Sequence, residues 1–147
     1  MIRKARKDDV PTLQAIERLA FAEDPWTDRM LLEEVEHPAG ICLVHDERDG
    51  PTGFILCRMV LDECHVHNVA VHPERRRGGI ARALLRAAET EAMARGAVVS
   101  HLEVAEDNTA ARAMYEGSQY AEVGRRARYY HGREAAVLMS RQLVPSL

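Results

Sequence analysis

The sequence predicts an α/β fold of the α+β type, with a mixed, mainly antiparallel sheet of about seven strands and about four helices on its two faces. Segments that fit strands outnumber those that fit helices. The early strands follow one another through short turns, which favours antiparallel hairpins. The helical segments carry apolar residues three and four positions apart, so each has one face to bury against a sheet.

In the first part of the chain, capping residues and apolar spacing define one strand and two helices. Asp8 or Asp9 can cap a helix that tolerates Pro11 in its first turn. Thr27 can cap the next helix, which the stretch 37–40 ends. The predicted elements, in order, are a strand at Ile2–Arg6, a helix from Asp8 or Asp9 to about Phe21 and a helix at Asp28–Glu36.

The rest of the chain is predicted to consist of strands interrupted by two helices. Residues 47–51 have the composition of a hairpin turn, and residues 61–63 turn the chain again. Gly96 is placed to end a long helix, and Asp107 or Asn108 to cap a shorter one. The predicted elements are strands at Ile41–His45, Thr52–Val60 and Cys64–Val71, a helix at Arg77–Arg95, a strand at Ala97–Val104, a helix to about Glu116, and strands at Tyr120–Arg126 and Ala135–Arg141.

Length and composition predict a single domain, residues 1–147, with a core of its own. The formal net charge of −3 and the pI near 6.2 argue against a general nucleic-acid or membrane-surface binder. No apolar signal core and no run of membrane-spanning length is seen. Cys42, Cys57 and Cys64 form no C-x-x-C pair, which favours reduced thiols in a cytoplasmic protein.

The stretch HNVAVHPERRRGGIARALL, residues 67–85, is the most informative part of the sequence. An apolar strand passes through an arginine- and glycine-rich turn into a helix, which leaves backbone N–H groups pointing one way at the positive end of the helix dipole. Gly78 and Gly79 let a diphosphate approach the backbone, and residues 75–77 add positive charge. No Lys-Ser/Thr follows the glycines, which excludes a P-loop for nucleotide triphosphates. The three-glycine dinucleotide fingerprint is also missing, and the turn does not follow the first strand. The alternative is a helix start with a solvated basic turn.

A second group of residues suited to chemistry lies in the stretch 101–116. Glu103 alternates with apolar neighbours on a predicted strand, and Tyr115 lies two turns along the helix that Asn108 begins. A carboxylate and a phenol in one cleft suit acyl transfer to an amine, which needs a base for the ammonium and an acid for the departing thiolate. The alternative interpretation is that Glu103 is a solvated strand residue and Tyr115 an aromatic residue of the core.

These motifs resemble the GNAT superfamily of N-acetyltransferases, whose pyrophosphate loop follows the pattern Gln/Arg-x-x-Gly-x-Gly/Ala, here Arg76-x-x-Gly79-x-Ala81. Over nearly its whole length the chain resembles the RimI-type branch, which acetylates the N-termini of ribosomal proteins. The other matching segments are Pro25-Trp26, Gly53–Ile55, His67–Pro73, Leu102–Val104, Asn108, Ala111, Tyr115-Glu116, Arg125–Tyr130 and Ala136–Met139.

The chain departs from the family pattern in two places. Ser118-Gln119-Tyr120 replaces the usual Leu-Gly-Phe, so the turn after the last helix lacks its glycine. The sequence between Tyr130 and Ala135 is shortened, which is expected to alter the substrate-facing loop.

The resemblance implies a GNAT fold whose central parallel strands, Cys64–Val71 and Ala97–Val104, splay apart around acetyl-CoA. Glu103 would deprotonate the amine through a water, a backbone N–H of the first strand would stabilise the oxyanion, and Tyr115 would protonate the coenzyme A thiolate. The amine attacks directly, with no cysteine nucleophile. The implied cofactor-binding residues are Val69, Ala70 and Val71 along the pantetheine arm, Arg76, Arg77, Gly78, Gly79, Ile80 and Ala81 around the pyrophosphate, and Asn108 and Tyr115.

The implied acceptor is the N-terminal α-amine of a protein or peptide that begins with a small residue such as alanine. The residues expected to contact it are Trp26, Asn68, Glu103, Tyr129 and Tyr130. An equally supported interpretation of Trp26 is that it packs the first two helices onto the sheet. The alternative for Tyr129 and Tyr130 is a pair of side chains on the surface of a hairpin. Alternative functions are acetylation of lysine side chains or of a small amine, and a non-catalytic coenzyme A sensor.

We expect a monomer or weak dimer without a nucleic-acid or membrane partner. His65-x-His67 presents two imidazoles on one face, but no third ligand follows at a suitable spacing. Satisfied or exposed histidines, and no metal, are therefore predicted. Arg125, Arg126 and Arg128 are expected to form a solvated strand edge, with contact to RNA or an acidic partner as the alternative.

Overall fold

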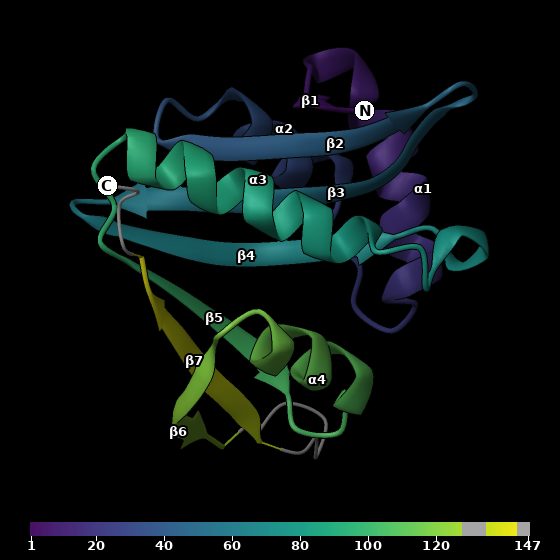
Figure 1. Cartoon of the computed structure of the whole chain (residues 1–147). Helices are drawn as coiled ribbons and strands as arrows, with labels where there is room; N and C mark the ends of the chain where they lie inside the picture. The colour runs from purple at the N-terminus through teal and green to yellow at the C-terminus, as the bar shows by residue number, and fades with distance from the viewer. Residues whose placement is uncertain (128–134, 144–147) are drawn as a thin grey trace.

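The computed structural model describes residues 1–127 and 135–143, and in these a single seven-stranded sheet has the order β1-β2-β3-β4-β5-β7-β6 (Figure 1). All neighbouring strands pair antiparallel except β4 and β5, which are parallel. The predicted fold class is therefore confirmed. The strands are β1 (Ile2–Lys4), β2 (Gly40–Glu47), β3 (Gly50–Val60), β4 (Glu63–Val71), β5 (Val99–Ala105), β6 (Ala121–Arg126) and β7 (Ala136–Gln142).

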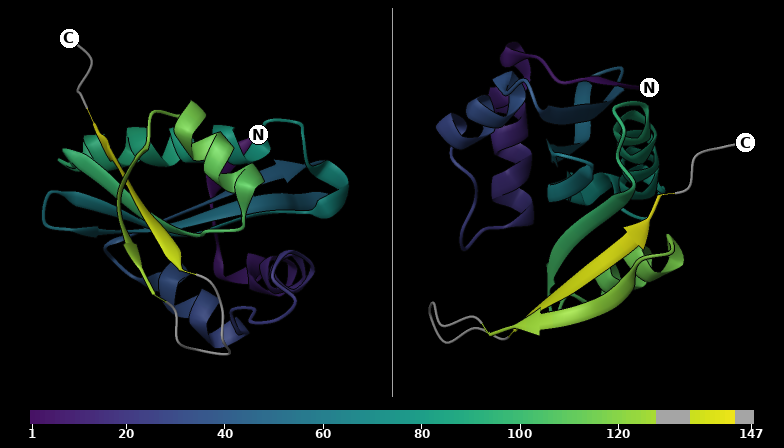
Figure 2. Two further views of the ribbon diagram at one scale, coloured as in Figure 1. Left: turned by 90° about the horizontal axis from the view of Figure 1, so that it is seen from below. Right: turned by 90° about the vertical axis from the view of Figure 1, so that its left-hand side faces the viewer.

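Four α-helices cover the sheet within the described residues: α1 (Val10–Ala20), α2 (Asp28–Glu36), α3 (Ile80–Ala94) and α4 (Thr109–Gly117). Helices α3 and α4 lie on one face and α1 and α2 on the other (Figure 2). Short 3₁₀ turns, η1 (Lys7–Asp9) and η2 (Pro73–Arg75), precede α1 and α3. Helices α1 and α2 pack on β2, β3 and β4. Among the described residues, no helix covers β5, β7 and β6 on the face that carries α1 and α2.

Most predicted elements agree with the structure to within two residues at their ends, but the predicted start of α3 is wrong. The sequence predicted a helix from Arg77, and the helix begins at Ile80. Arg77 has a φ of 69° and Gly79 a φ of 77°, both in the left-handed region that a right-handed helix cannot contain. Residues 77–79 therefore belong to the loop that precedes the helix.

The parallel pair β4–β5 separates after four residues, as the family resemblance implied. Pairing runs from Glu63–Val99 to Val66–Leu102 and then stops. At this point β4 contains a bulge, because Leu56 of β3 pairs with Asn68 while Cys57 pairs with Val66. The extra residue, His67, bends the strand and increases its local twist. The C-terminal halves of β4 and β5 therefore diverge, and β4 from Asn68 onward has a free edge toward β5.

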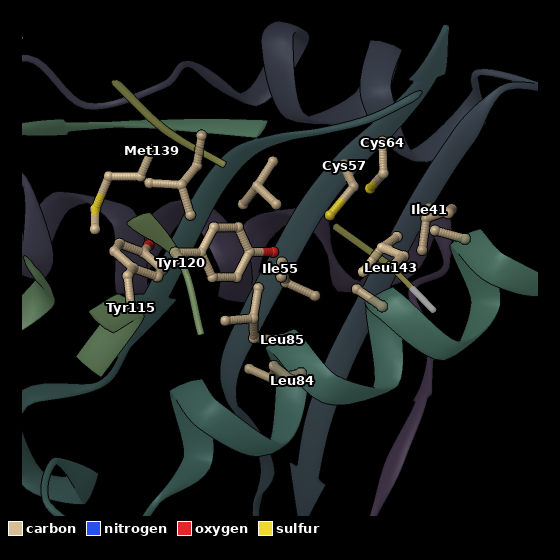
Figure 3. Close-up of a cluster of buried hydrophobic side chains, with 14 of the residues drawn as sticks. Ile41, Ile55, Cys57, Cys64, Leu84, Leu85, Tyr115, Tyr120, Met139 and Leu143 are labelled. Atoms are coloured by element: carbon tan, nitrogen blue, oxygen red, sulfur yellow. The ribbon is translucent and has the colours of Figure 1, made fainter. Parts of the chain in front are cut away.

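The sheet separates two apolar cores. Strand β3 contributes to both because its side chains alternate, with Ile55 and Cys57 toward α3 and Phe54 and Leu56 toward α1 and α2. This explains why the run 53–57 is apolar throughout and fully buried. The core beneath α3 also includes Leu84, Leu85, Tyr115, Tyr120, Met139 and Leu143 (Figure 3).

Helix α4 ends in a left-handed turn at the position where the family's glycine is replaced. The N–H of Gln119 donates to the carbonyl of Glu116 (3.1 Å), and that of Tyr120 to the carbonyl of Tyr115 (3.0 Å). These two bonds define a Schellman motif, with Gln119 at its left-handed position (φ 75°). The rings of Tyr115 and Tyr120 meet edge to face, 5.9 Å apart, and supply the apolar contact of the motif.

Replacing Gln119 by glycine should stabilise the protein, because glycine adopts positive φ without the steric cost of a Cβ. We expect Gln119→Gly to raise the free energy of unfolding by about 1 kcal/mol and Tm by about 3 °C. Thermal and denaturant unfolding measure both. Ser118→Gly is the control, since Ser118 has a φ of −100° and gains nothing from glycine. Equal effects of the two substitutions would contradict this explanation.

Candidate active site

The loop between β4 and α3 has the geometry of an anion-binding site. Gly79 precedes the first residue of α3 and offers no side-chain cap, so the N–H groups of the first helical turn have no partner within the helix. No oxygen of the described residues accepts a bond from the amides of residues 76–79. These donors lie at the positive end of the helix dipole, which favours phosphate. The loop therefore fits the predicted diphosphate.

The charge and openness of this loop agree with that role. A Cβ built on Gly79 would meet no atom of the described residues within 4 Å, so the backbone is accessible there. The side chains of Arg76 and Arg77 are exposed, and Arg75 lies 3.4 Å from Glu47. The three arginines make the approach to the loop positive, apart from the carboxylate paired with Arg75.

A cavity of about 500 Å³ occupies the gap between the diverging halves of β4 and β5. One wall is formed by the end of α1 and the segment that links it to α2, and the opposite wall by β5 and α4. Six predicted site residues line this cleft: Trp26, Asn68, Val69, Glu103, Asn108 and Tyr115. Residues that are far apart in the sequence thus meet in one place, as predicted.

Glu103 lies on the exposed face of β5, and its side chain is 30% exposed. Both carboxylate oxygens accept from Nη2 of Arg126 on β6, each at 2.6 Å. The expectation that Arg126 belongs to a solvated strand edge is therefore incomplete, because its guanidinium pairs with the candidate base. An incoming ammonium must share or replace this cation at the carboxylate.

Tyr115 presents a protonated phenol to the cleft from a buried position. The residue is 8% exposed, and its ring belongs to the core beneath α3. Burial raises the pKa of Tyr115 to about 12, because the charged phenolate is poorly solvated there. The hydroxyl therefore retains its proton at neutral pH, as an acid that protonates a thiolate must.

Other predicted cofactor residues contribute mainly through the backbone. The Asn108 side chain caps α4 by accepting from the N–H of Ala111 (3.2 Å), so its oxygen serves the helix. Val69, Ala70 and Val71 pair with β3 on one side only. Their other edge faces the gap, where an extended ligand can add as a strand.

The acceptor-side wall depends on a residue that sequence reasoning missed. Glu17 of α1 is 1% exposed and accepts from the N–H of Trp26 (3.2 Å) and from Nδ2 of Asn68 (2.7 Å). Burial raises the pKa of Glu17, and its two hydrogen bonds oppose that rise. Asn68 was predicted to contact the acceptor, and its amide nitrogen donates to Glu17. A signal existed, since Glu17 lies four residues after Leu13 on the apolar face of the predicted helix.

A second cavity, of about 370 Å³, continues the cleft on the face that carries α1 and α2. It shares Val66, His67, Leu102 and Glu103 with the first cavity and extends over β5, β6 and β7. Tyr129 and Tyr130, which were expected at the acceptor entrance, lie outside the described residues. Within the described residues, the two cavities are therefore neighbours that meet at these four shared residues.

The remaining chemically active side chains have ordinary partners. Within residues 1–127 and 135–143, no group of three or more His, Cys, Asp or Glu side chains is arranged to hold a metal ion. His65 lies 3.1 Å from Glu63, and His67 lies 3.9 Å from Glu34. The three cysteines are free and buried. No helix in the described part of the chain has the length and apolarity to cross a membrane.

Comparison with known proteins identifies the family. The model of the acetyltransferase (GNAT) family matches residues 9–118. The chain belongs to the GNAT family. This membership confirms the predicted class of enzyme, an acetyltransferase, and the predicted cofactor, acetyl-CoA.

Individual GNAT relatives support the RimI-type resemblance. The [ribosomal protein bS18]-alanine N-acetyltransferase of Salmonella typhimurium is 35% identical over 136 residues, which cover 90% of each chain. The crystal structure of the ribosomal-protein-S18-alanine N-acetyltransferase from Escherichia coli has a TM-score of 0.90 at 29% identity, covering 100% of this chain and 96% of that one. An aminoglycoside 6'-N-acetyltransferase complexed with coenzyme A shares the fold alone, with 18% identity, a TM-score of 0.84, and coverage of 100% and 99%.

Replacing Gly79 by alanine should weaken coenzyme A binding specifically. The Cβ strains the left-handed backbone and turns the amides at the start of α3 away from the diphosphate, so we expect the Kd for coenzyme A to rise about tenfold or more. Isothermal titration calorimetry measures it. Gly96, at the other end of α3, has a φ of 95° and provides a matched control. Gly96→Ala should cost similar stability and leave the Kd unchanged; equal losses of affinity would exclude a local role for Gly79.

Proposed function

We propose that this protein transfers the acetyl group of acetyl-CoA to the α-amine of a protein's N-terminal alanine, with a ribosomal protein of the bS18 type as the acceptor. The observation that carries the proposal is that Glu103 and Tyr115 line the same cleft, between a loop suited to diphosphate and an open groove. The proposal includes a cytoplasmic enzyme that acts as a monomer or weak dimer and needs no nucleic-acid partner.

The acceptor amine arrives as an ammonium ion and must lose a proton before it attacks. Among the carboxylates that line the cleft, we assign this step to Glu103, which takes the proton directly or through a water. Its ion pair with Arg126 keeps a cation beside the carboxylate until the substrate's own cation arrives. Glu103 therefore serves both to attract the N-terminus and to deprotonate it.

Acetyl-CoA supplies an activated acetyl thioester. The amides of residues 76–81 are suited to hold its diphosphate, and the free edge of β4 at Val69–Val71 to pair with the extended arm. A backbone N–H on that edge is suited to stabilise the oxyanion that forms when the amine attacks. Tyr115, whose hydroxyl keeps its proton at neutral pH, donates the proton that the departing thiolate requires.

A protein N-terminus fits this groove better than a small amine does. The cleft continues into a second cavity over β5, β6 and β7, so residues that follow the acetylated amine have a surface to lie on. Trp26 adds a large and rigid contact area at the entrance. The relatives with 35% and 29% identity are named for an N-terminal alanine substrate, which supports the same acceptor for this chain.

Glu103→Gln and Tyr115→Phe should each lower kcat by about 100-fold, because each removes a proton-transfer group while keeping its shape. The measurement is thiol release with an alanine-initiated peptide, with the Kd for coenzyme A measured in parallel and expected to change by less than about twofold. Glu106→Gln and Tyr120→Phe are matched controls that line no part of the cleft. Near wild-type turnover of both test variants across pH would exclude the assigned roles.

A panel of acceptors tests the substrate class. We expect acetylation of peptides with a free N-terminal alanine, and loss of product when that amine is blocked, because Glu103 acts on an α-ammonium at the end of the groove. Mass spectrometry locates the acetyl group, with lysine-containing N-blocked peptides, polyamines and an aminoglycoside as competitors. Product on lysine side chains or small amines alone would refute the N-terminal assignment.

A further inference from the structure

We propose that the buried carboxylate of Glu17 is a positioning residue that fixes the segment between α1 and α2 as the acceptor wall of the cleft. The carboxylate connects three parts of the molecule. It belongs to α1, accepts from the backbone of Trp26 in the linking segment, and accepts from Asn68 on β4. The inference rests on the proposed function in one respect, namely that this cleft receives the acceptor amine.

The linking segment, residues 21–27, has no regular secondary structure to fix its shape, and residues 21–24 are exposed. Within the segment a long bond joins the N–H of Asp24 to the carbonyl of Phe21 (3.3 Å). A seven-residue loop of this kind samples many conformations unless its backbone is bound.

Helix α1 holds Trp26 by both sides of its peptide backbone. The Trp26 N–H donates to Oε1 of Glu17 (3.2 Å), and its carbonyl accepts from Nε2 of Gln14 (3.0 Å). Gln14 and Glu17 are three residues apart and therefore neighbours on one face of the helix. Both side chains are buried, where a hydrogen bond to a charged group contributes most.

The third connection fixes this assembly to the reacting centre. Oε2 of Glu17 accepts from Asn68 at 2.7 Å, and Asn68 follows the bulge at which β4 leaves β5. The ring of Trp26 lies against the bulged residue, His67, with a centroid distance of 6.5 Å. These contacts fix the position of the cleft wall relative to the free edge of β4, beside which the amine must attack.

A stability role alone does not account for the position of Glu17. A carboxylate in a core costs free energy unless its bonds are complete, and an apolar residue fits the Leu13 and Ile16 face of α1 at lower cost. Glu17 also lines the cleft opposite Glu103. We therefore expect its removal to change how the acceptor binds more than how the donor binds or how fast bound substrates react.

The first test uses Trp26, the single tryptophan of the chain, as a reporter of the linking segment. Glu17→Ala should shift its fluorescence emission and raise its quenching by acrylamide, without substrates present. Glu89→Ala is the matched control, because Glu89 is also buried (3% exposed) but bonds to Tyr120 and Arg141 beneath α3. An unchanged Trp26 signal in folded Glu17→Ala would overturn the proposal.

The second test exchanges the hydrogen-bond donor and acceptor of the Glu17–Asn68 pair in two steps. Asn68→Asp opposes two carboxylates and should raise KM for an alanine-initiated peptide about tenfold or more, with kcat and KM for acetyl-CoA changed by less than about threefold. Adding Glu17→Gln to this variant restores one donor and one acceptor, and should recover both KM and the Trp26 signal. A double variant no better than Asn68→Asp would overturn the proposal, even if Glu17→Ala does not fold.

The outcomes separate this inference from the proposed function. The fluorescence tests need no substrate, so they judge the role of Glu17 whatever the acceptor is. If the wild-type protein acetylates only a small amine, the proposed function fails. The second test is then carried out with KM for that amine instead of KM for the peptide. If the peptide is acetylated and the Glu17 variants leave both KM and the Trp26 signal unaltered, the inference alone fails.

Discussion

The early end of the pairing between β4 and β5 is the constraint on which the rest of the structure depends. Four paired residues keep the sheet continuous, and the bulge at His67 then directs the two strands apart. The gap gives β4 a free edge, exposes Glu103 on β5 and lets α4 bring Tyr115 to the opening. A sheet paired to its ends has none of these features, because backbone bonds and packed side chains fill the same space.

Much of this arrangement was predictable because its causes are local. Thr27 and Asn108 cap the helices that the sequence assigned to them, since a cap acts within three residues. The turn of arginines and glycines before α3 likewise combines donors, charge and backbone freedom in one short stretch. The splayed parallel pair followed from the family resemblance, not from the spacing of apolar residues.

The features that escaped prediction depend on long-range contacts or on individual backbone angles. The pairing of Arg126 with Glu103 spans 23 residues, and that of Asn68 with Glu17 spans 51. Composition alone says nothing about which strand residue will face a given helix residue. The left-handed φ of Arg77 and of Gln119 was equally hidden, because residues other than glycine adopt it only when their surroundings impose it.

The two cores on either side of the sheet differ in what they support. The core beneath α3 holds the helix that begins at the proposed donor loop, and the core beneath α1 and α2 holds the proposed acceptor wall. Because the sheet lies between them, substitutions in one core leave the packing of the other largely intact. With the sheet as a partition, the proposed acceptor wall can be reshaped from its own core without direct contact with the helix at the proposed donor loop.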